Sequence, residues 1–407
     1  PMLQNIAVFW LLEQGWHEIL LLNDCFLHKF YLLMLRTYCL MGYNSPLLCL
    51  KVDAWNMCDI LPDLYSDYLI AQNKYATATG LAQMMPDEVS HDKVTRLLNK
   101  PASGSKELWL EVKADVRKIQ NDDGVLSLDD MVSEKPYTDE SSIICWHYSH
   151  AKNRLVKGSN IITMMVRYGD VSLPVGYDVI QKDIHYSDIK TKKEKRRASI
   201  SKNAYFRSLI GWAVTNCIQF KHILADSWYA SKENMNYIHN ELKKLFIFGI
   251  KSNRGIAMSE DDKKNGLYQQ LKDSSLEDGV PAKVYLKDIL FPVLLMKEAF
   301  THEDGGTAVR YLVTNDLSLD ARQILDLYKK RWSIEEYHKS VKQNASFEKS
   351  PTRTLNSQLN HIFYSVVAFC KLERLKIRTK LNHFAIKAKL LLRANMIAMQ
   401  ELKSMTT

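Results

Sequence analysis

The chain has 407 residues, a hydrophobic content of 46% and a formal net charge of +9. This length and composition suit a folded protein of two or three domains, and no stretch reaches the roughly 18 apolar residues that a membrane-spanning helix needs. The seven cysteines are scattered without zinc-ligand spacing, which argues against a disulfide framework and for free thiols in a reducing compartment. The basic balance suggests a polyanionic partner.

Residues 1–56 differ from the rest of the chain. They hold three of the seven cysteines, do not begin with Met and show no regular polar face. A secretory signal peptide fits poorly, because there is no basic start and no clear cleavage site. We expect an atypical N-terminal extension, with the functional chain beginning near Met57. A genuine helical N-terminal domain is the alternative.

Helical periodicity characterises residues 57–120. The segment Thr79–Met85 predicts a short helix, a Pro-Asp pair breaks it, and a serine then caps a second helix over His91–Leu98. Two short helices joined by a tight break resemble a helix-turn-helix, whose second helix would offer Lys93 and Arg96 to DNA. We therefore expect a helical DNA-binding region, with an ordinary helical pair as the alternative.

Strand and helix patterns alternate across residues 121–254. Two of the expected strands end in acids, at Asp129-Asp130 and at Asp226. The order of three strands, helix, strand, helix and strand predicts an α/β fold, a ribonuclease H-like mixed sheet with helices on both faces. The expected strands are Gly124–Asp129, Ile161–Arg167, Val171–Ile180, His222–Asp226 and Leu245–Ile250, and the expected helices are Lys202–Phe220 and Glu233–Lys244.

Further along, residues 255–320 have β character and predict a β-rich insertion, with strands over Val284–Leu286, Phe291–Phe300 and Val309–Val313. Residues 321–375 would return to the core, and residues 376–407 would form a C-terminal helical region. The charge run Lys190–Arg197 predicts a solvated loop, with phosphate contact as the alternative.

The stretch 328–342 predicts a helix with an unusual face. At about 100° per residue, one sector roughly 80° wide collects an acid, two cations, a phenol and an imidazole, namely Glu335, Arg331, Lys342, Tyr328 and His338. Glu336 points about 100° away from Glu335. The alternative is a solvated helix with an i,i+4 ion pair between Arg331 and Glu335.

Acids on neighbouring strands and on a facing helix supply the oxygen ligands that Mg²⁺ or Mn²⁺ prefers. Two such ions can activate a nucleophilic oxygen and stabilise the leaving oxygen in phosphoryl transfer. Arg331 offers a fork to phosphate and Lys342 a point charge, while Tyr328 could donate to phosphate or stack on a base. Together these residues predict metal-dependent chemistry on nucleic acid.

The spacing Tyr-(two)-Arg-(three)-Glu-(six)-Lys over Tyr328, Arg331, Glu335 and Lys342 resembles the signature of DDE transposases of the insertion sequence four family. The resemblance extends from about Leu64 to Leu391. It implies a ribonuclease H-like core interrupted by a β-insertion, and cut-and-paste transposition through DNA hairpin intermediates. Its further segments are Ile143–Tyr148 with Lys157-Gly158, Asp226–Tyr229 and Lys251–Arg254.

The same resemblance implies that Asp129, Asp226 and Glu335 are the catalytic, metal-binding acids. The family usually has Thr two positions after the first Asp, but Met131 stands there if that acid is Asp129. Strand alternation leaves Asp130 open as the alternative, and we expect Asp129. Further expected DNA contacts come from Trp228, Lys251 and Arg254, although core packing is an equal alternative for Trp228.

The expected partners are the terminal inverted repeats of a transposable element and its target DNA, bound by a homodimer, with no membrane. The expected location is the bacterial cytoplasm, in association with the nucleoid. Two other functions stay open at this point. One is a remnant that binds element ends without cutting them, and the other is a metal-dependent nuclease of the same fold that does not join strands.

Overall fold

A computed structural model describes residues 60–149, 152–189, 192–301 and 305–406. The chain divides into two compact units, Pro1–Leu61 and Pro62–Thr407. The expected N-terminal extension, residues 1–56, lies outside the described residues. All of the elements below belong to the second unit, apart from the first two residues of a helix over residues 60–71.

Three further helices follow this first helix before the sheet begins. As predicted, the Ser90 side chain caps the second of them by accepting a hydrogen bond from the Lys93 N–H. This second helix, α5 (His91–Leu98), buries Val94, Leu97 and Leu98 and packs against the long helix α12 (Leu355–Thr379). The three helices are α4 (Ala78–Met84), α5 (His91–Leu98) and α6 (Ser105–Ile119).

The central sheet is mixed. Strands β1 (Val125–Glu134), β3 (Arg154–Tyr168) and β4 (Val171–Val179) pair antiparallel. Strand β1 also pairs in parallel with β7 (His222–Ala225), which pairs in parallel with β8 (Leu245–Ile250). All four β7 residues are buried, as expected for a parallel strand covered on both faces.

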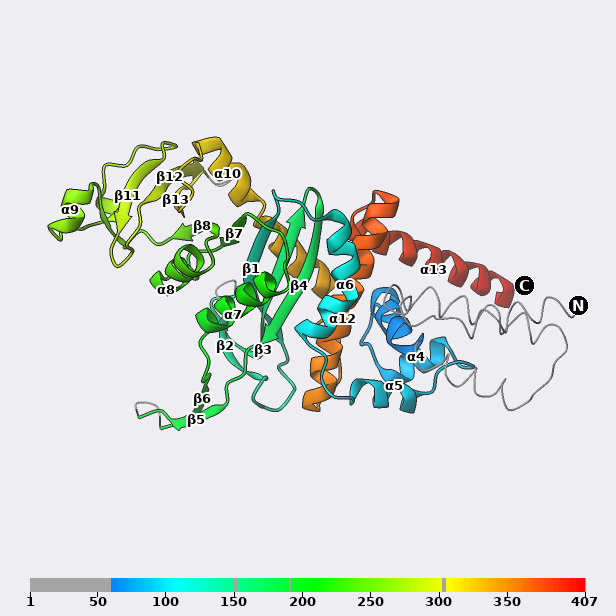
Figure 1. The fold of residues 1–407 in the computed structure, drawn as a ribbon. Coiled ribbons are helices and arrows are strands. Elements are labelled where there is room, and N and C mark those ends of the chain that lie inside the picture. Colours follow the sequence, from blue (N-terminus) through cyan, green and yellow to red (C-terminus); the bar gives the residue numbers. More distant parts are fainter. Residues whose placement is uncertain (1–59, 150–151, 190–191, 302–304, 407) are drawn as a thin grey trace, which may run out of the picture. The chain divides into compact units, whose positions relative to one another are not determined.

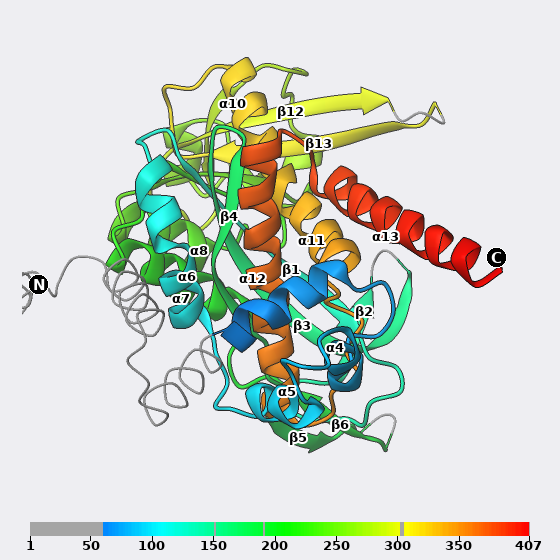
Figure 2. The same cartoon turned by 90° about the vertical axis from the view of Figure 1, so that its right-hand side faces the viewer.

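Helices cover both faces of this sheet. Helices α7 (Lys202–Thr215) and α8 (Lys232–Asn236) lie on one side, and α6 and α12 lie on the other (Figures 1 and 2). This arrangement is compatible with a ribonuclease H-like fold. Helix α7 ends before the predicted Phe220 because Cys217 adopts a left-handed backbone conformation (φ 52°). Helix α8 continues as a π-helical turn over Tyr237–Glu241.

The predicted strand Gly124–Asp129 is too short. Strand β1 runs on to Glu134, so Asp129 and Asp130 lie in its middle rather than at its end. Two adjacent acids interrupt the apolar pattern that marks a strand, but β3 pairs with β1 along its whole length, from Val125 to Glu134. Tertiary pairing therefore overrides the local signal.

The β-rich segment 255–320 extends the same sheet. Its strand β13 (Thr307–Thr314) pairs antiparallel with β8, and β12 (Val293–Thr301) pairs with β13. The remaining elements of this segment are β9 (Gly255–Ala257), α9 (Glu260–Lys264), β10 (Gln269–Gln270), a 3₁₀ turn over Leu271–Asp273 and β11 (Ala282–Leu286).

One hydrophobic cluster connects this segment with the central strands. It joins the β-rich segment, the central strands and helix α10 (Ala321–Lys329) in a single core. Helix α10 is therefore held on the sheet by apolar contacts from both parts of the chain. The cluster consists of Val125, Leu224, Ile247, Met296, Leu312, Ile324 and Tyr328.

The structure corrects one further expectation and adds one strand that the sequence analysis did not identify. Strand β6 (Glu194–Arg197) pairs with β5 (Ile184–Ser187), so most of the charged run expected to be a loop forms a hairpin; residues 190–191 lie outside the described residues. Another strand, β2 (Cys145–Ser149), adds to β3 at the edge of the sheet. Both strands of the hairpin are mostly exposed, so no alternation of apolar and polar residues marks them in the sequence.

The predicted single helix over 328–342 is two helices. Helix α10 ends at Lys329 and α11 (Trp332–Asn344) begins three residues later. At the junction the N–H groups of Lys330, Arg331 and Ser333 donate to carbonyls three residues earlier, a tighter turn than the α-helical one. Tyr328 therefore lies on α10, and Arg331 occupies the position just before α11 without a side-chain capping hydrogen bond.

Helix α12 is followed by the last helix, α13 (His383–Thr406). No helix of the described chain is long and apolar enough to cross a membrane. Cys145, Cys217 and Cys370 are free thiols.

A buried acid fastens the two C-terminal helices to the sheet. Glu373 of α12 is 2% exposed; it accepts hydrogen bonds from Lys376 Nζ (2.7 Å) and from the Ser172 N–H of β4, and lies 2.9 Å from His383 Nε2 of α13. The other ring nitrogen, His383 Nδ1, lies 2.9 Å from Ser340 Oγ of α11. Burial opposes ionisation of Glu373, but these hydrogen bonds outweigh burial and lower its pKa.

We expect Glu373→Ala to lower the free energy of unfolding by about 3–5 kcal/mol at neutral pH, because the change leaves the buried hydrogen-bond partners of Glu373 without an acceptor. A carboxylate whose pKa is lowered by folding stabilises the folded state at pH values above its unfolded-state pKa, which is about 4.3 for Glu. This stabilisation is lost as the pH falls below about 4.3 toward the lower pKa of the folded state. The difference between parent and variant should therefore shrink in acid. Denaturant unfolding at several pH values measures it. Glu401→Ala, an exposed change on α13, should stay within about 0.5 kcal/mol, and an equal effect of both changes would contradict the role of Glu373.

Candidate active site

Two aspartates lie at the same level on neighbouring strands. The parallel pairing of β1 with β7 ends at Ser127 and Leu224. Carried two residues further, this register places Asp129 level with Asp226, which follows the last residue of β7. Because β7 stops there, the side of β1 at Asp129 opens into a groove instead of facing another strand.

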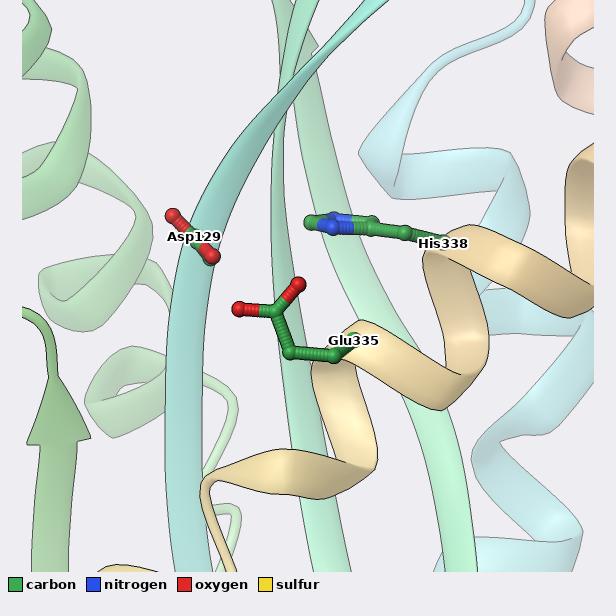
Figure 3. Close-up of side chains that lie close together, drawn as sticks. All are labelled: Asp129, Glu335 and His338. Carbon is green, nitrogen blue, oxygen red and sulfur yellow. The ribbon is translucent and has the colours of Figure 1, made fainter. Parts of the chain in front are cut away.

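Helix α11 brings the third acid to the same place. It contacts β1, and the carboxylate of Glu335 and the imidazole of His338 both point from α11 toward Asp129 (Figure 3). One potential ligand atom from each of these three residues lies within 4.8 Å of the other two. Asp226 lies outside this set, but it is close enough to Asp129 to affect its ionisation.

The electrostatics of Asp129 reflect this crowding. Burial, followed by the charges of Asp226, Glu335 and Asp130, raises its pKa to about 8. Burial also raises the pKa of Asp226. Carboxylates collected in a partly buried cleft repel one another unless a cation joins them, and carboxylate oxygen is the donor that Mg²⁺ and Mn²⁺ prefer. The donor set therefore fits a divalent cation.

Asp130 is engaged elsewhere. One oxygen accepts a hydrogen bond from Lys202 Nζ (2.6 Å), and the other accepts one from Tyr229 Oη (2.8 Å). Burial opposes its ionisation, but the charge of Lys202 and these hydrogen bonds outweigh burial and lower its pKa. Adjacent residues of a strand face opposite sides, so the two neighbouring acids have different surroundings.

Arg331 forms ion pairs with two of these acids, Asp129 and Glu335. Its Nη1 lies 3.2 Å from Glu335 Oε1 and 3.8 Å from Asp129 Oδ2. The ion pair that the sequence left as an alternative is therefore present, but Arg331 is largely buried rather than solvated. Its guanidinium group lies beside the acids, where it can contact an anionic ligand.

Lys342 has an acidic partner of its own, Glu348. Its Nζ lies 3.1 Å from Glu348 Oε1 and donates a hydrogen bond to the Val132 carbonyl of β1 (2.9 Å). It also lines the groove beside the two aspartates. A phosphate would thus compete with Glu348 for this ammonium group.

Tyr328 cannot stack on a base in this conformation. Its ring is 6% exposed and belongs to the hydrophobic cluster around α10. The guanidinium carbons of Arg310 and Arg331 lie 5.2 and 5.6 Å from its centroid. Burial raises the pKa of Tyr328, so its hydroxyl stays a hydrogen-bond donor.

An open groove of about 690 Å³ runs past Asp129, Asp130 and Asp226. Three half-exposed aromatic side chains line it: Trp146 and Tyr148 of β2, and Trp228, which is 45% exposed. Four lysines also line the groove, namely Lys152, Lys182, Lys202 and Lys342. Of these, Lys202 Nζ lies 5.2 Å from the centroid of the Trp228 ring. A groove lined by both flat rings and cations suits an unpaired nucleic-acid strand.

The other predicted DNA contacts are not gathered at the acids. Lys93 and Arg96 lie on α5, which packs against α4 and α12. Lys251 and Arg254 lie on the turn after β8. Since β7 and β8 are parallel, that turn is at the same edge of the sheet as Asp226, one strand further from β1.

The sequence placed His338 on the acidic face but assigned it no role. It is 9% exposed, and burial lowers its pKa to about 3, so the imidazole is neutral. Its spacing of three residues from Glu335 was the available signal. Lys202 was also missed, because nothing in the sequence links it to an acid 72 residues earlier.

Residues 194–370 match the family model of the transposase DDE domain. The matched segment includes Asp226, Glu335 and the junction of α10 with α11, and begins after Asp129. This match supports a DDE transposase, a nuclease-type enzyme of a kind that generally uses divalent metal ions and acts on DNA. No curated protein matches the chain.

The contrast between the neighbouring aspartates predicts that only one of them stabilises the fold when no divalent metal is present. Asp130→Asn should lower the free energy of unfolding by about 1.5–3 kcal/mol, because it weakens hydrogen bonds from Lys202 and Tyr229 to a charged group. Asp129→Asn should cause no loss, since its surroundings disfavour the charge that Asn removes. Denaturant unfolding in EDTA measures both, and Asp130→Glu serves as a control that keeps the charge. Equal losses in the two Asn variants would contradict this assignment.

Proposed function

We propose that the protein is a DNA transposase of the insertion sequence four type. It would cleave the ends of its element and join them to target DNA in a Mg²⁺- or Mn²⁺-dependent, cut-and-paste reaction, acting as a homodimer at the bacterial nucleoid. The observation that supports this proposal is that Asp226 and Glu335, from two other parts of the chain, both lie close enough to Asp129 to raise its pKa further than burial alone does, with Glu335 in the same cluster of potential ligand atoms.

In this proposal the three carboxylates are the catalytic metal ligands. Two divalent ions, when bound, would activate a water or a 3′-hydroxyl and stabilise the leaving oxygen of an in-line phosphoryl transfer. The register of β1 with β7, carried two residues further, would align Asp129 with Asp226, and α11 would supply Glu335. Asp130 supports the site by holding Lys202 and Tyr229.

The chain's cations would orient the DNA. Arg331 lies beside the acids and offers a fork of donors to a phosphate, and Lys342 offers a point charge. The hydroxyl of Tyr328 would donate to the same phosphate. Lys251 and Arg254 would hold DNA at the edge of the sheet, Trp228 would stack on an unpaired base, and Lys93 and Arg96 would contact the terminal repeats.

Two alternatives keep the same fold. A remnant would bind its element ends without cutting them, which the missing Thr after the first acid motivates, because Met131 stands there. A metal-dependent nuclease would cut without joining strands. Products of a single reaction separate all three, since a remnant yields none and a nuclease yields cleaved but unjoined DNA.

The acids should be essential for cleavage. With Mg²⁺, the full chain should cut a plasmid carrying the DNA that flanks its own coding sequence. Asp226→Ala or Glu335→Ala should lower the cleavage rate more than about 100-fold, because even groups outside the metal ligands cost 10–100-fold when removed. Binding of the flanking DNA should change little.

Glu336→Ala is the matched control, because Glu336 is the exposed neighbour of Glu335 on α11. It should cleave at the parent rate, and EDTA should stop every variant. Cleavage within about tenfold of the parent after Asp226→Ala or Glu335→Ala would refute the role of these acids.

Arg331 and Lys342 should each account for about one phosphate contact. For either residue changed to Ala, the slope of log affinity against log salt should become shallower by about 0.9. Arg331→Lys should keep most of the slope but lose affinity, because an ammonium group has no fork. Fluorescence anisotropy with a flanking-DNA duplex at several salt concentrations measures both quantities.

Arg378→Ala, an exposed change at the end of α12, removes the same charge far along the chain from these residues and should leave the slope unchanged. If Arg331 only pairs with Glu335, its loss would alter neither affinity nor slope. An unchanged slope in both Arg331→Ala and Lys342→Ala would therefore exclude phosphate contact.

A further inference from the structure

A buried imidazole beside the acids has an unused nitrogen. His338 Nε2 is inaccessible to solvent and has no hydrogen-bond partner among the residues that the structure describes. A buried polar atom without a partner is costly. Its ring points from α11 toward Asp129, as the carboxylate of Glu335 does (Figure 3).

The spacing of these groups leaves room for an ion. Their potential ligand atoms lie within 4.8 Å of one another. No direct hydrogen bond joins His338 to either acid. When three atoms coordinate one octahedral ion at about 2.1 Å, they lie about 3–4 Å from one another. Small side-chain rotations would bring all three onto a single cation.

Helical geometry also favours this role. Glu335 and His338 are three residues apart on α11 and so share a face. A Glu-x-x-His pair projecting from a helix supplies a carboxylate and an imidazole to metal ions in di-iron and di-manganese helical bundles. Here Asp129 on β1 supplies the facing carboxylate.

We propose that His338 is a nitrogen ligand of the divalent ion held by Asp129 and Glu335. The inference rests on the proposed metal-dependent function and adds a donor that the three acids do not include. Imidazole suits Mn²⁺ and later transition metals better than Mg²⁺, which prefers oxygen. His338 therefore biases the site toward Mn²⁺ and leaves Mg²⁺ with mainly carboxylate ligands.

Pulsed electron paramagnetic resonance of the full chain with Mn²⁺ tests the inference directly. The bound ion should show ¹⁴N modulation from a coordinated imidazole. That modulation should change to the ¹⁵N pattern when the protein is made with ¹⁵N-histidine. The experiment needs no cleavage, and it is run with and without a linear DNA duplex.

Variants identify which histidine is bound. His338→Gln should abolish the modulation and weaken Mn²⁺ binding at least about tenfold, with a smaller effect on Mg²⁺. His338→Asn repeats the test with a shorter side chain if the first variant fails to fold. His147→Gln is the matched control, because His147 is also buried with an unpartnered Nε2 but lies outside the acidic cluster.

The outcomes distinguish this inference from the proposed function. Mn²⁺ that binds in an Asp129-dependent way without histidine modulation would overturn the role of His338 and leave the three-acid site intact. Modulation that persists in His338→Gln would likewise assign the nitrogen to another histidine. No binding of Mn²⁺, with or without DNA, would overturn both.

Discussion

The site depends on the unequal pairing of one strand. Strand β1 has β3 along its full length on one side, but β7 pairs with it over only three residues on the other. The long pairing holds the backbone at Asp129 and Asp130 in an extended conformation, although two adjacent acids are poor strand formers. The short pairing ends where Asp226 leaves the sheet. The same strand is therefore rigid at the acids and open beside them.

Strand alternation then separates the functions of two neighbouring carboxylates. Asp130 neutralises Lys202 and accepts a hydrogen bond from Tyr229, and its pKa is lowered against the effect of burial. Asp129 faces Glu335 and Asp226, with Arg331 as an ion-pair partner, and its pKa is raised. The folded structure stabilises the charged form of Asp130 but disfavours the charged form of Asp129, which a bound cation would stabilise. Such uncompensated acids are typical of functional sites.

The position of Glu335 depends on packing contacts that lie far from the other acids. The hydrophobic cluster fixes α10, the tight turn at Lys330 and Arg331 redirects the chain, and α11 crosses β1. At its far end α11 is fastened by Ser340, whose hydroxyl lies beside His383, itself beside Glu373. The β-rich segment contributes Met296 and Leu312 to the cluster that holds α10. It therefore helps to position Glu335 without supplying an acid.

The sequence by itself determined much of the element order, the second strand-end acid and the face of α11 that carries Glu335, His338 and Lys342. These features depend on local periodicity and capping, which neighbouring residues set. Tertiary structure alone decided that β1 continues past its acids, that Tyr328 is buried, and that Lys342 meets Glu348. It also decided which of Asp129 and Asp130 meets Glu335. Those outcomes depend on residues far apart in the chain, whose contacts no local pattern encodes.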